Sequence, residues 1–126
     1  MNARLRVHSR LVKRDVHFAA PATSSPIHPG EFLAEDLQRL GIKLRRLAHD
    51  LRVPVNRISA IINGKRSITP DTALRLSRYF GTSPQYWMNL QTAYDLAVAV
   101  RSKGATIDRD VHPLNSVTGY ETPKLL

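Results

Sequence analysis

The feature that most constrains the fold of this chain is a pair of short amphipathic segments with almost nothing between them. Residues 44–51 (LRRLAHDL) and the stretch VPVNRISAIINGKR at residues 53–66 both carry apolar residues at helical spacing. Helices this short are not stable alone. A joint made only of Arg52 and Val53 forces a sharp angle between them, and Ala48 falls where they approach most closely. This spacing is typical of a helix-turn-helix.

Three further segments, at residues 28–40, 69–80 and 83–100, carry helix signals. Each has a proline near its start, and a glycine follows the first two, which favours helix boundaries at those points. Their predicted apolar faces are formed by Leu33, Leu37 and Leu40, by Ala73, Leu76, Ser77 and Phe80, and by Trp87, Leu90, Tyr94, Ala97 and Val98.

We therefore expect an all-α fold, with a five-helix helix-turn-helix domain at residues 27–101 and no convincing strand. Residues 1–26 combine basic side chains with a Pro/Ala/Ser/Thr-rich end, which predicts a flexible arm. Residues 102–126 form a short C-terminal tail that we associate with dimerisation. Within it, ATIDRDVHPL at residues 105–114 is compatible with a short helix or with a strand.

The charge of the chain favours a polyanionic partner. Nineteen Lys and Arg residues stand against ten Asp and Glu, for a formal net charge of +9, which favours nucleic acid or an anionic surface. The absence of cysteine excludes disulfides, thiolate metal sites and a cysteine nucleophile. No apolar run approaches the ~18 residues of a membrane span, so we expect a cytoplasmic protein with no membrane partner.

The second helix of a helix-turn-helix lies in the major groove of DNA, and residues 55–63 suit that position. Between its apolar residues the segment carries small or amide side chains, and Lys65 and Arg66 follow its end, where phosphate oxygens would lie. Asn56, Ser59 and Asn63 are predicted to hydrogen-bond base edges, and Val55 and Ala60 to touch thymine methyl groups.

Nothing in the sequence favours catalysis or a metal site. The histidines, which are His8, His17, His28, His49 and His112, lack the spacing of metal ligands. His49 beside Asp50 hints at acid–base chemistry, but both fall on a predicted solvent face. Acidic residues near the start of the first helix are explained by its dipole. We therefore expect a protein that is not an enzyme and has no cofactor.

The motifs also resemble a known family. HPGEFL, followed by LAHDLRVPVNRISAIINGKRSITPDTALRLSRYFGTSPQYWMNLQTAYDL, is similar to the HigA/VapI-type antitoxins of the Xre, lambda-repressor-like helix-turn-helix family, over roughly residues 28–98. The resemblance implies a five-helix, dimeric protein that represses its own operon and neutralises a small ribonuclease toxin of the HigB type. It places DNA contacts on Asn56, Arg57, Ser59, Lys65 and Arg66.

This sequence departs from the family pattern at three places. Arg52 stands in the turn where members usually carry glycine, and we expect the turn to be held without positive φ because that backbone would strain arginine. Lys43 replaces a capping Ser or Thr at the start of the second helix. Lys43 substitutes for the lost phosphate-binding amide by its charge, and Arg45 is assigned to DNA with it. We expect the basic arm before His28 to be inert or weakly DNA-binding.

A single module covers little DNA, so we expect a homodimer on an inverted-repeat operator in double-stranded DNA. The predicted interface is the fifth helix with the tail through Leu114, since Trp87, Tyr94 and Val98 exceed what a small core needs. Two alternatives stay open: a solitary Xre-family regulator without a toxin, and a helical module that binds protein or RNA.

Overall fold

The computed structural model describes Phe18 and residues 25–114. Five helices follow one another in this part of the chain: α2 (Pro29–Leu40), α3 (Leu44–Leu51), α4 (Val55–Ile62), α5 (Pro70–Phe80) and α6 (Pro84–Asp110). No strand occurs among the described residues, which confirms the predicted all-α, five-helix fold. The predicted arm at residues 1–26 lies outside the described residues except for Phe18 and residues 25–26.

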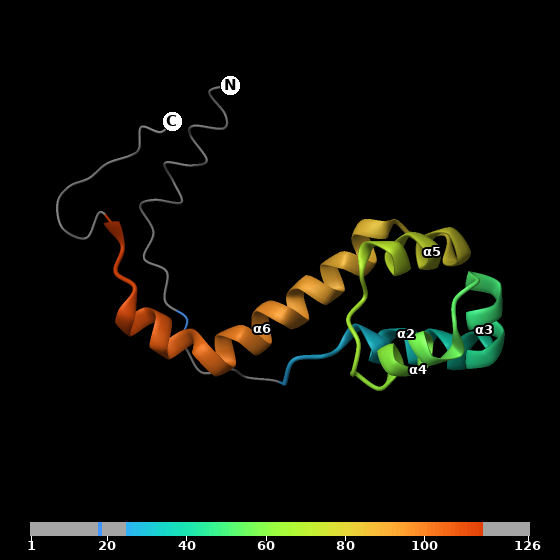
Figure 1. The fold of residues 1–126 in the computed structure, drawn as a ribbon, viewed down its shortest axis with the longest axis horizontal. Coiled ribbons are helices and arrows are strands. Elements are labelled where there is room, and N and C mark those ends of the chain that lie inside the picture. Colours follow the sequence, from blue (N-terminus) through green and yellow to red (C-terminus); the bar gives the residue numbers. More distant parts are fainter. Residues whose placement is uncertain (1–17, 19–24, 115–126) are drawn as a thin grey trace, which may run out of the picture. The chain divides into compact units, whose positions relative to one another are not determined.

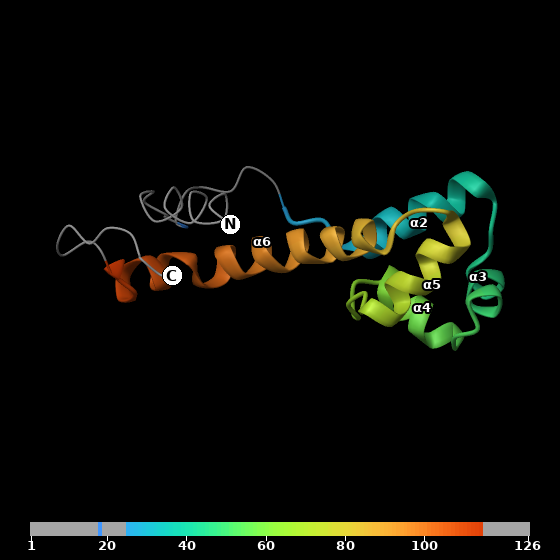
Figure 2. The ribbon, with the colours of Figure 1, turned by 90° about the horizontal axis from the view of Figure 1, so that it is seen from above.

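Two compact units divide the chain, one at residues 24–98 and the other made of residues 1–23 and 99–126. In the first unit, α4 packs against both α2 and α3, and α5 packs against α3 (Figures 1 and 2). In the second unit, the Phe18 backbone N–H donates to Asp108 Oδ2 at 2.7 Å, and Gly104 is buried beneath Phe18.

Local capping chemistry explains where α2 and α5 begin and end. His28 is the N-cap of α2 and accepts a hydrogen bond from the Gly30 N–H through Nδ1 at 2.9 Å. Thr69 caps α5 by accepting from the Thr72 N–H, as its sequence position predicts. Gly41 and Gly81 end α2 and α5 in the left-handed conformation that glycine adopts without strain.

The core is formed by α2, α3, α4 and α5 together with Ile68, which precedes α5, and Trp87 of α6. Its fully or almost fully buried apolar side chains are Leu33, Leu37, Leu47, Ala48, Leu51, Ile58, Ile61, Ile68, Ala73, Leu76 and Trp87. Gly30 is essential to this packing, because a Cβ there would collide with the Ile61 carbonyl of α4. The prediction for Leu40 was wrong: its side chain is 48% exposed at the end of α2 and does not continue the stripe.

The turn between α3 and α4 is longer and more strained than the sequence predicted. Pro54 is the N-cap of α4, so three residues separate the helices. Arg52 adopts φ 61° and ψ 45°, which corrects the expectation of a turn without positive φ. The Arg52 N–H donates to the His49 carbonyl and the Val53 N–H to the Ala48 carbonyl, which is the Schellman pattern. Tertiary packing thus imposes a conformation that arginine does not favour.

Helix α6 extends well past the predicted end of the helical domain at residue 101. It continues to Asp110, so most of the segment for which a short helix or a strand stayed open is helical. None of the helices in the described part is both long and apolar enough to cross a membrane.

Candidate nucleic-acid interface

Helix α4 buries one face in the core of the domain and turns the opposite face toward solvent. Ile58 and Ile61 are fully buried against α2 and α3. On the opposite side lie the residues predicted to meet base edges and thymine methyl groups: Val55, Asn56 and Asn63 are exposed, and Ser59 and Ala60 are half-buried. Because the buried face is fixed in the core, the orientation of this polar face relative to the domain is fixed as well.

The basic pair after α4 lies on an ordered turn. The Gly64 N–H donates to the Ile61 carbonyl and the Lys65 N–H to the Ala60 carbonyl, at 3.0 and 2.8 Å, with Gly64 at φ 75°. Lys65 and Arg66 are both exposed. This turn directs the chain out of the helix and leaves both cations available to solvent or to a polyanion.

The start of α3 adds further positive charge. Lys43 occupies the N-cap position, and its side chain makes no capping hydrogen bond, as the loss of Ser or Thr predicts. An open hollow at this place is lined by Gly41, Lys43, Arg45, Arg46 and His49. Lys43 and Arg45 are exposed there, which suits them to contact phosphate.

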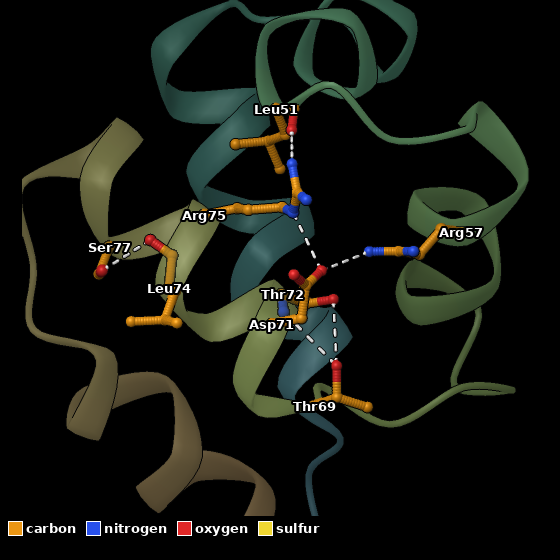
Figure 3. A network of polar contacts seen from close by, with 8 residues as sticks. All are labelled: Leu51, Arg57, Thr69, Asp71, Thr72, Leu74, Arg75 and Ser77. Atoms are coloured by element: carbon orange, nitrogen blue, oxygen red, sulfur yellow. Dashed lines mark hydrogen bonds and ion pairs between the residues drawn. The ribbon is translucent and has the colours of Figure 1, made fainter.

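Arg57 has a different environment from its neighbours on α4. Its Nη1 donates to Asp71 Oδ2 on α5 at 2.9 Å, and only 24% of its side chain is exposed (Figure 3). The same carboxylate oxygen accepts from Arg75 Nε, also at 2.9 Å. The hydrogen bonds from Arg75 and Arg57 lower the pKa of Asp71, so the carboxylate is ionised at neutral pH.

Arg75 connects this ion-pair cluster to the turn. Its Nη1 donates to the carbonyl of Leu51, the last residue of α3, at 2.8 Å (Figure 3). Neither Asp71 nor Arg75 was predicted to belong to the site, although a carboxylate and a guanidinium at positions i and i+4 of a helix form a recognisable signal in the sequence.

A second polar cluster joins α3 to α5. Tyr79 Oη donates to Asp50 Oδ2 at 2.8 Å, and Arg46 Nε lies 3.3 Å from the same oxygen. The hydrogen bonds from Tyr79 and His49 lower the pKa of Asp50, and that carboxylate raises the pKa of Tyr79. An ionised Asp50 bound to Tyr79 serves to hold two helices together, so its position next to His49 does not indicate acid–base chemistry. No cluster of three potential metal-ligating side chains occurs within the described residues.

The three residues predicted at a dimer interface have different positions. Trp87 is fully buried, and its Nε1 donates to Thr82 Oγ1 at 2.8 Å. That prediction is corrected, because a side chain enclosed by its own core has no surface left for a second copy. Tyr94 is half-buried and packs edge-on against His28, with ring centroids 4.8 Å apart. Val98 is 39% exposed, so it remains a candidate contact.

Comparisons with known proteins agree with this geometry. A helix-turn-helix family model matches residues 33–87. Virulence-associated protein I of Dichelobacter nodosus is 51% identical over 78 residues, which cover 61% of this chain and 72% of that protein.

Two solved structures are similar in fold as well as in sequence. An addiction module antidote protein of a HigA family from Coxiella burnetii is 52% identical with a TM-score of 0.70, and the match covers 71% of this chain and 99% of that one. The antitoxin HigA of Pseudomonas aeruginosa, solved with the higBA promoter, is 43% identical with a TM-score of 0.69, over 71% of this chain and 98% of that one.

Proposed function

We propose a function from one premise: the chain belongs to the HigA family of helix-turn-helix proteins. Its function is sequence-specific repression of transcription, carried out by a homodimer on an inverted-repeat operator. The protein works by binding rather than by catalysis, in the cytoplasm where its DNA lies. The observation that carries this proposal is α4, with Ile58 and Ile61 locked in the core and Asn56 exposed on the other face.

The operator is best found by selection from a pool of random DNA duplexes, followed by footprinting of the enriched sequence. A helix-turn-helix dimer protects two half-sites about 34–36 Å apart, one turn of DNA. We expect an enriched inverted repeat with this spacing. A helical module that binds protein or RNA would enrich no duplex sequence, and that result would remove the proposal.

Different residues should supply specificity and affinity. Asn56 and Ser59 lie early in α4 and are assigned to base edges, and Lys65 and Arg66 lie beyond its end and are assigned to phosphates. Asn56→Ala should weaken binding to the selected operator by about 1–3 kcal/mol and leave random duplex almost unaffected. Lys65→Ala should weaken both and flatten the log–log salt dependence by about one unit for each protomer bound. Salt titrations of the two duplexes with each variant measure both quantities, and the opposite pattern would require another orientation of α4.

The second part of the proposal is an antitoxin role, in which the chain binds and neutralises a small ribonuclease toxin. The names of its relatives, which include Antitoxin HigA-1 of Vibrio cholerae at 38% identity, support this role. Charge argues the other way, since ten Lys and Arg outnumber six Asp and Glu in residues 27–100 and a basic toxin prefers an acidic surface. Co-expression with a small reading frame that neighbours the gene of this chain decides between these roles. Rescue of growth from the product of that frame, with co-purification of the two proteins, supports an antitoxin, and the absence of both supports a solitary regulator.

A further inference from the structure

The loop between α4 and α5 carries the basic pair that is assigned to phosphates, and it is anchored at both ends. At its start, the N–H groups of Gly64 and Lys65 donate to carbonyls in the last turn of α4. At its end, Ile68 is 1% exposed in the core, and its N–H donates to Gln91 Oε1 of α6 at 2.7 Å. Arg66 lies exposed between these two anchors. The backbone of the loop is therefore fixed before any DNA is bound.

Gln91 is buried, and its amide group has a single favourable orientation. The residue is 4% exposed, although glutamine is mostly found at protein surfaces. Its Nε2 donates to Asp95 Oδ1, one turn further along α6, at 2.9 Å. A reversed amide would place its oxygen against this carboxylate and its nitrogen against the Ile68 N–H, so neither hydrogen bond could form. Asp95 therefore orients Gln91, and Gln91 holds the end of the loop.

The hydrogen bond to Gln91 decides how firmly the end of the loop is held. Without that acceptor, the Ile68 N–H would lose its partner in a buried place, which is costly. The segment relieves this cost by moving toward water, and the chain between Lys65 and Ile68 then samples several conformations. DNA would have to order it again, and fixing the backbone of one residue is worth about a tenfold change in affinity. The placement of Arg66 on DNA thus depends on the acceptor that Gln91 supplies.

We propose that Gln91 is a positioning residue for DNA binding, which holds the loop so that Lys65 and Arg66 meet phosphates without a further ordering cost. This inference rests on the proposed DNA-binding function and deepens it. Phosphates are the same in every sequence, so Gln91 supports affinity for operator and random duplex equally. It adds no phosphate contact of its own, so the salt dependence of binding does not change with it. These two properties together distinguish it from a residue that reads bases and from a cation that binds phosphate.

The test is Gln91→Met, which removes the acceptor and keeps a side chain of similar length. Denaturant titration first sets conditions in which every variant is folded. Salt titrations with the selected operator and a random-sequence duplex should then show affinity about tenfold lower per protomer on both, with an unchanged log–log slope. Arg66→Ala should instead flatten that slope by about one unit per protomer. Thr82→Val is the matched control, because it removes the acceptor of the Trp87 indole N–H and takes no part in the loop. It should leave both affinities unchanged.

Two combined variants separate positioning from a general structural effect. When Lys65→Ala and Arg66→Ala are both present, Gln91→Met should lower DNA affinity no further, because no phosphate contact remains for which the loop must be ordered. The double variant Gln91→Glu/Asp95→Asn keeps the net charge, and it still offers an oxygen to the Ile68 N–H while accepting from the new amide. It should bind both duplexes like the parent.

The inference is overturned if Gln91→Met leaves both affinities unchanged, weakens only the operator, or acts as strongly when both cations are absent. One further measurement needs no variant: in the parent without DNA, the Ile68 amide hydrogen should exchange slowly with solvent, and fast exchange would also overturn the inference. A parent that binds DNA while Gln91→Met binds equally well refutes this inference alone. A parent that binds neither duplex refutes the proposed function as well.

Discussion

Helices α2 and α3 are neighbours in the chain, but the residues at their ends differ in how well they suit a helix boundary. Helix α2 has a side-chain N-cap at His28 and a glycine, Gly41, in the left-handed position after its last turn. Helix α3 begins at Lys43, which makes no capping hydrogen bond, and ends at Arg52 in the same left-handed conformation. Both helices end with Schellman hydrogen bonds and a left-handed residue. Glycine adopts that conformation readily at the end of α2, whereas arginine adopts it at a cost at the end of α3.

This difference shows which forces hold each helix in place. Helix α2 carries its own boundary signals, whereas α3 depends on contacts with the rest of the domain. Leu47, Ala48 and Leu51 are buried against the core, and Arg75 satisfies the carbonyl of Leu51 that the turn leaves without a helical partner. Tertiary packing therefore sets the angle of the helix-turn-helix joint, and local preference does not.

The largest effect is expected from Ala48→Leu. Ala48 and Leu37 hold equivalent positions, since each carbonyl accepts the second Schellman hydrogen bond of its turn, from Val53 and Ile42 respectively. Leucine fits in α2 but would overpack the fully buried site in α3, at a cost of about 1–3 kcal/mol. Denaturant titration measures the loss, and operator binding should fall because α4 is displaced. Ala93→Leu, at an exposed site on α6, is the control, and equal effects of the two variants would contradict the proposed joint.

An exchange of residues between the two turns should produce effects of opposite sign. Gly41→Arg places a side chain in the left-handed region where nothing lies within 4 Å of an added Cβ, so its cost of about 1 kcal/mol comes from the backbone alone. Arg52→Gly should relieve the same strain and stabilise the protein by about 0.5–1 kcal/mol. Thermal melting of both variants checks the signs. A loss of stability in Arg52→Gly would mean that the arginine side chain contributes more than its backbone costs.

The sequence predicted those parts of the fold that depend on local signals. Helical periodicity and capping residues such as Thr69 predicted five helices, and the spacing around Ala48 predicted the joint. The conformation of Arg52 could not be predicted, because the packing of α3 against α4 imposes it. Helix periodicity placed Trp87 on an apolar face but could not tell whether that face meets the core or a second copy.

As with the fold, the sequence predicted the features of the candidate site that depend on helical periodicity and did not predict those that depend on tertiary contacts. The exposed positions of Asn56 and Asn63 follow from helical periodicity, because the opposite face must be buried. The ion pair of Arg57 with Asp71 does not follow from it, since the two residues are separated by a turn and lie on different helices. The role of such a residue depends on a contact that exists only once the helices are packed.

The third expected effect is smaller and concerns the start of α3. Lys43 has the extended backbone of an N-cap, with φ −80° and ψ 149°, so serine should fit there and accept a hydrogen bond from the first turn. Lys43→Ser should therefore stabilise the domain by about 0.5–1 kcal/mol, as a side-chain cap usually does. The same change should weaken binding to operator and random duplex alike, because a phosphate contact is lost. If melting temperature and DNA affinity moved in the same direction, one of these two assignments would be wrong.

The smallest effect is expected at the start of α2, where the cap can titrate. Burial lowers the pKa of His28 below its ordinary value of 6.5, and attraction to Asp95 and Glu31 offsets part of that shift. The folded state thus favours the neutral imidazole, whose Nδ1 accepts from the Gly30 N–H. Stability from this residue is complete above pH 6.5 and is lost as pH falls through the unfolded pKa toward the lower folded one.

His28→Asn tests this dependence, because asparagine is a good N-cap without a titrating group. Denaturant titrations from pH 7.5 to 5 should show the parent losing more stability than the variant, by less than the equivalent of one bound proton. All other residues are the same in the two proteins, so their contributions cancel in the difference. Parallel pH profiles would mean that His28 caps α2 equally well when protonated, and that the α2 boundary depends on Pro29 and Gly41 rather than on the imidazole. In that case α2 would resemble α3 at its N-terminus, and the contrast between the two helices would be confined to their C-terminal turns.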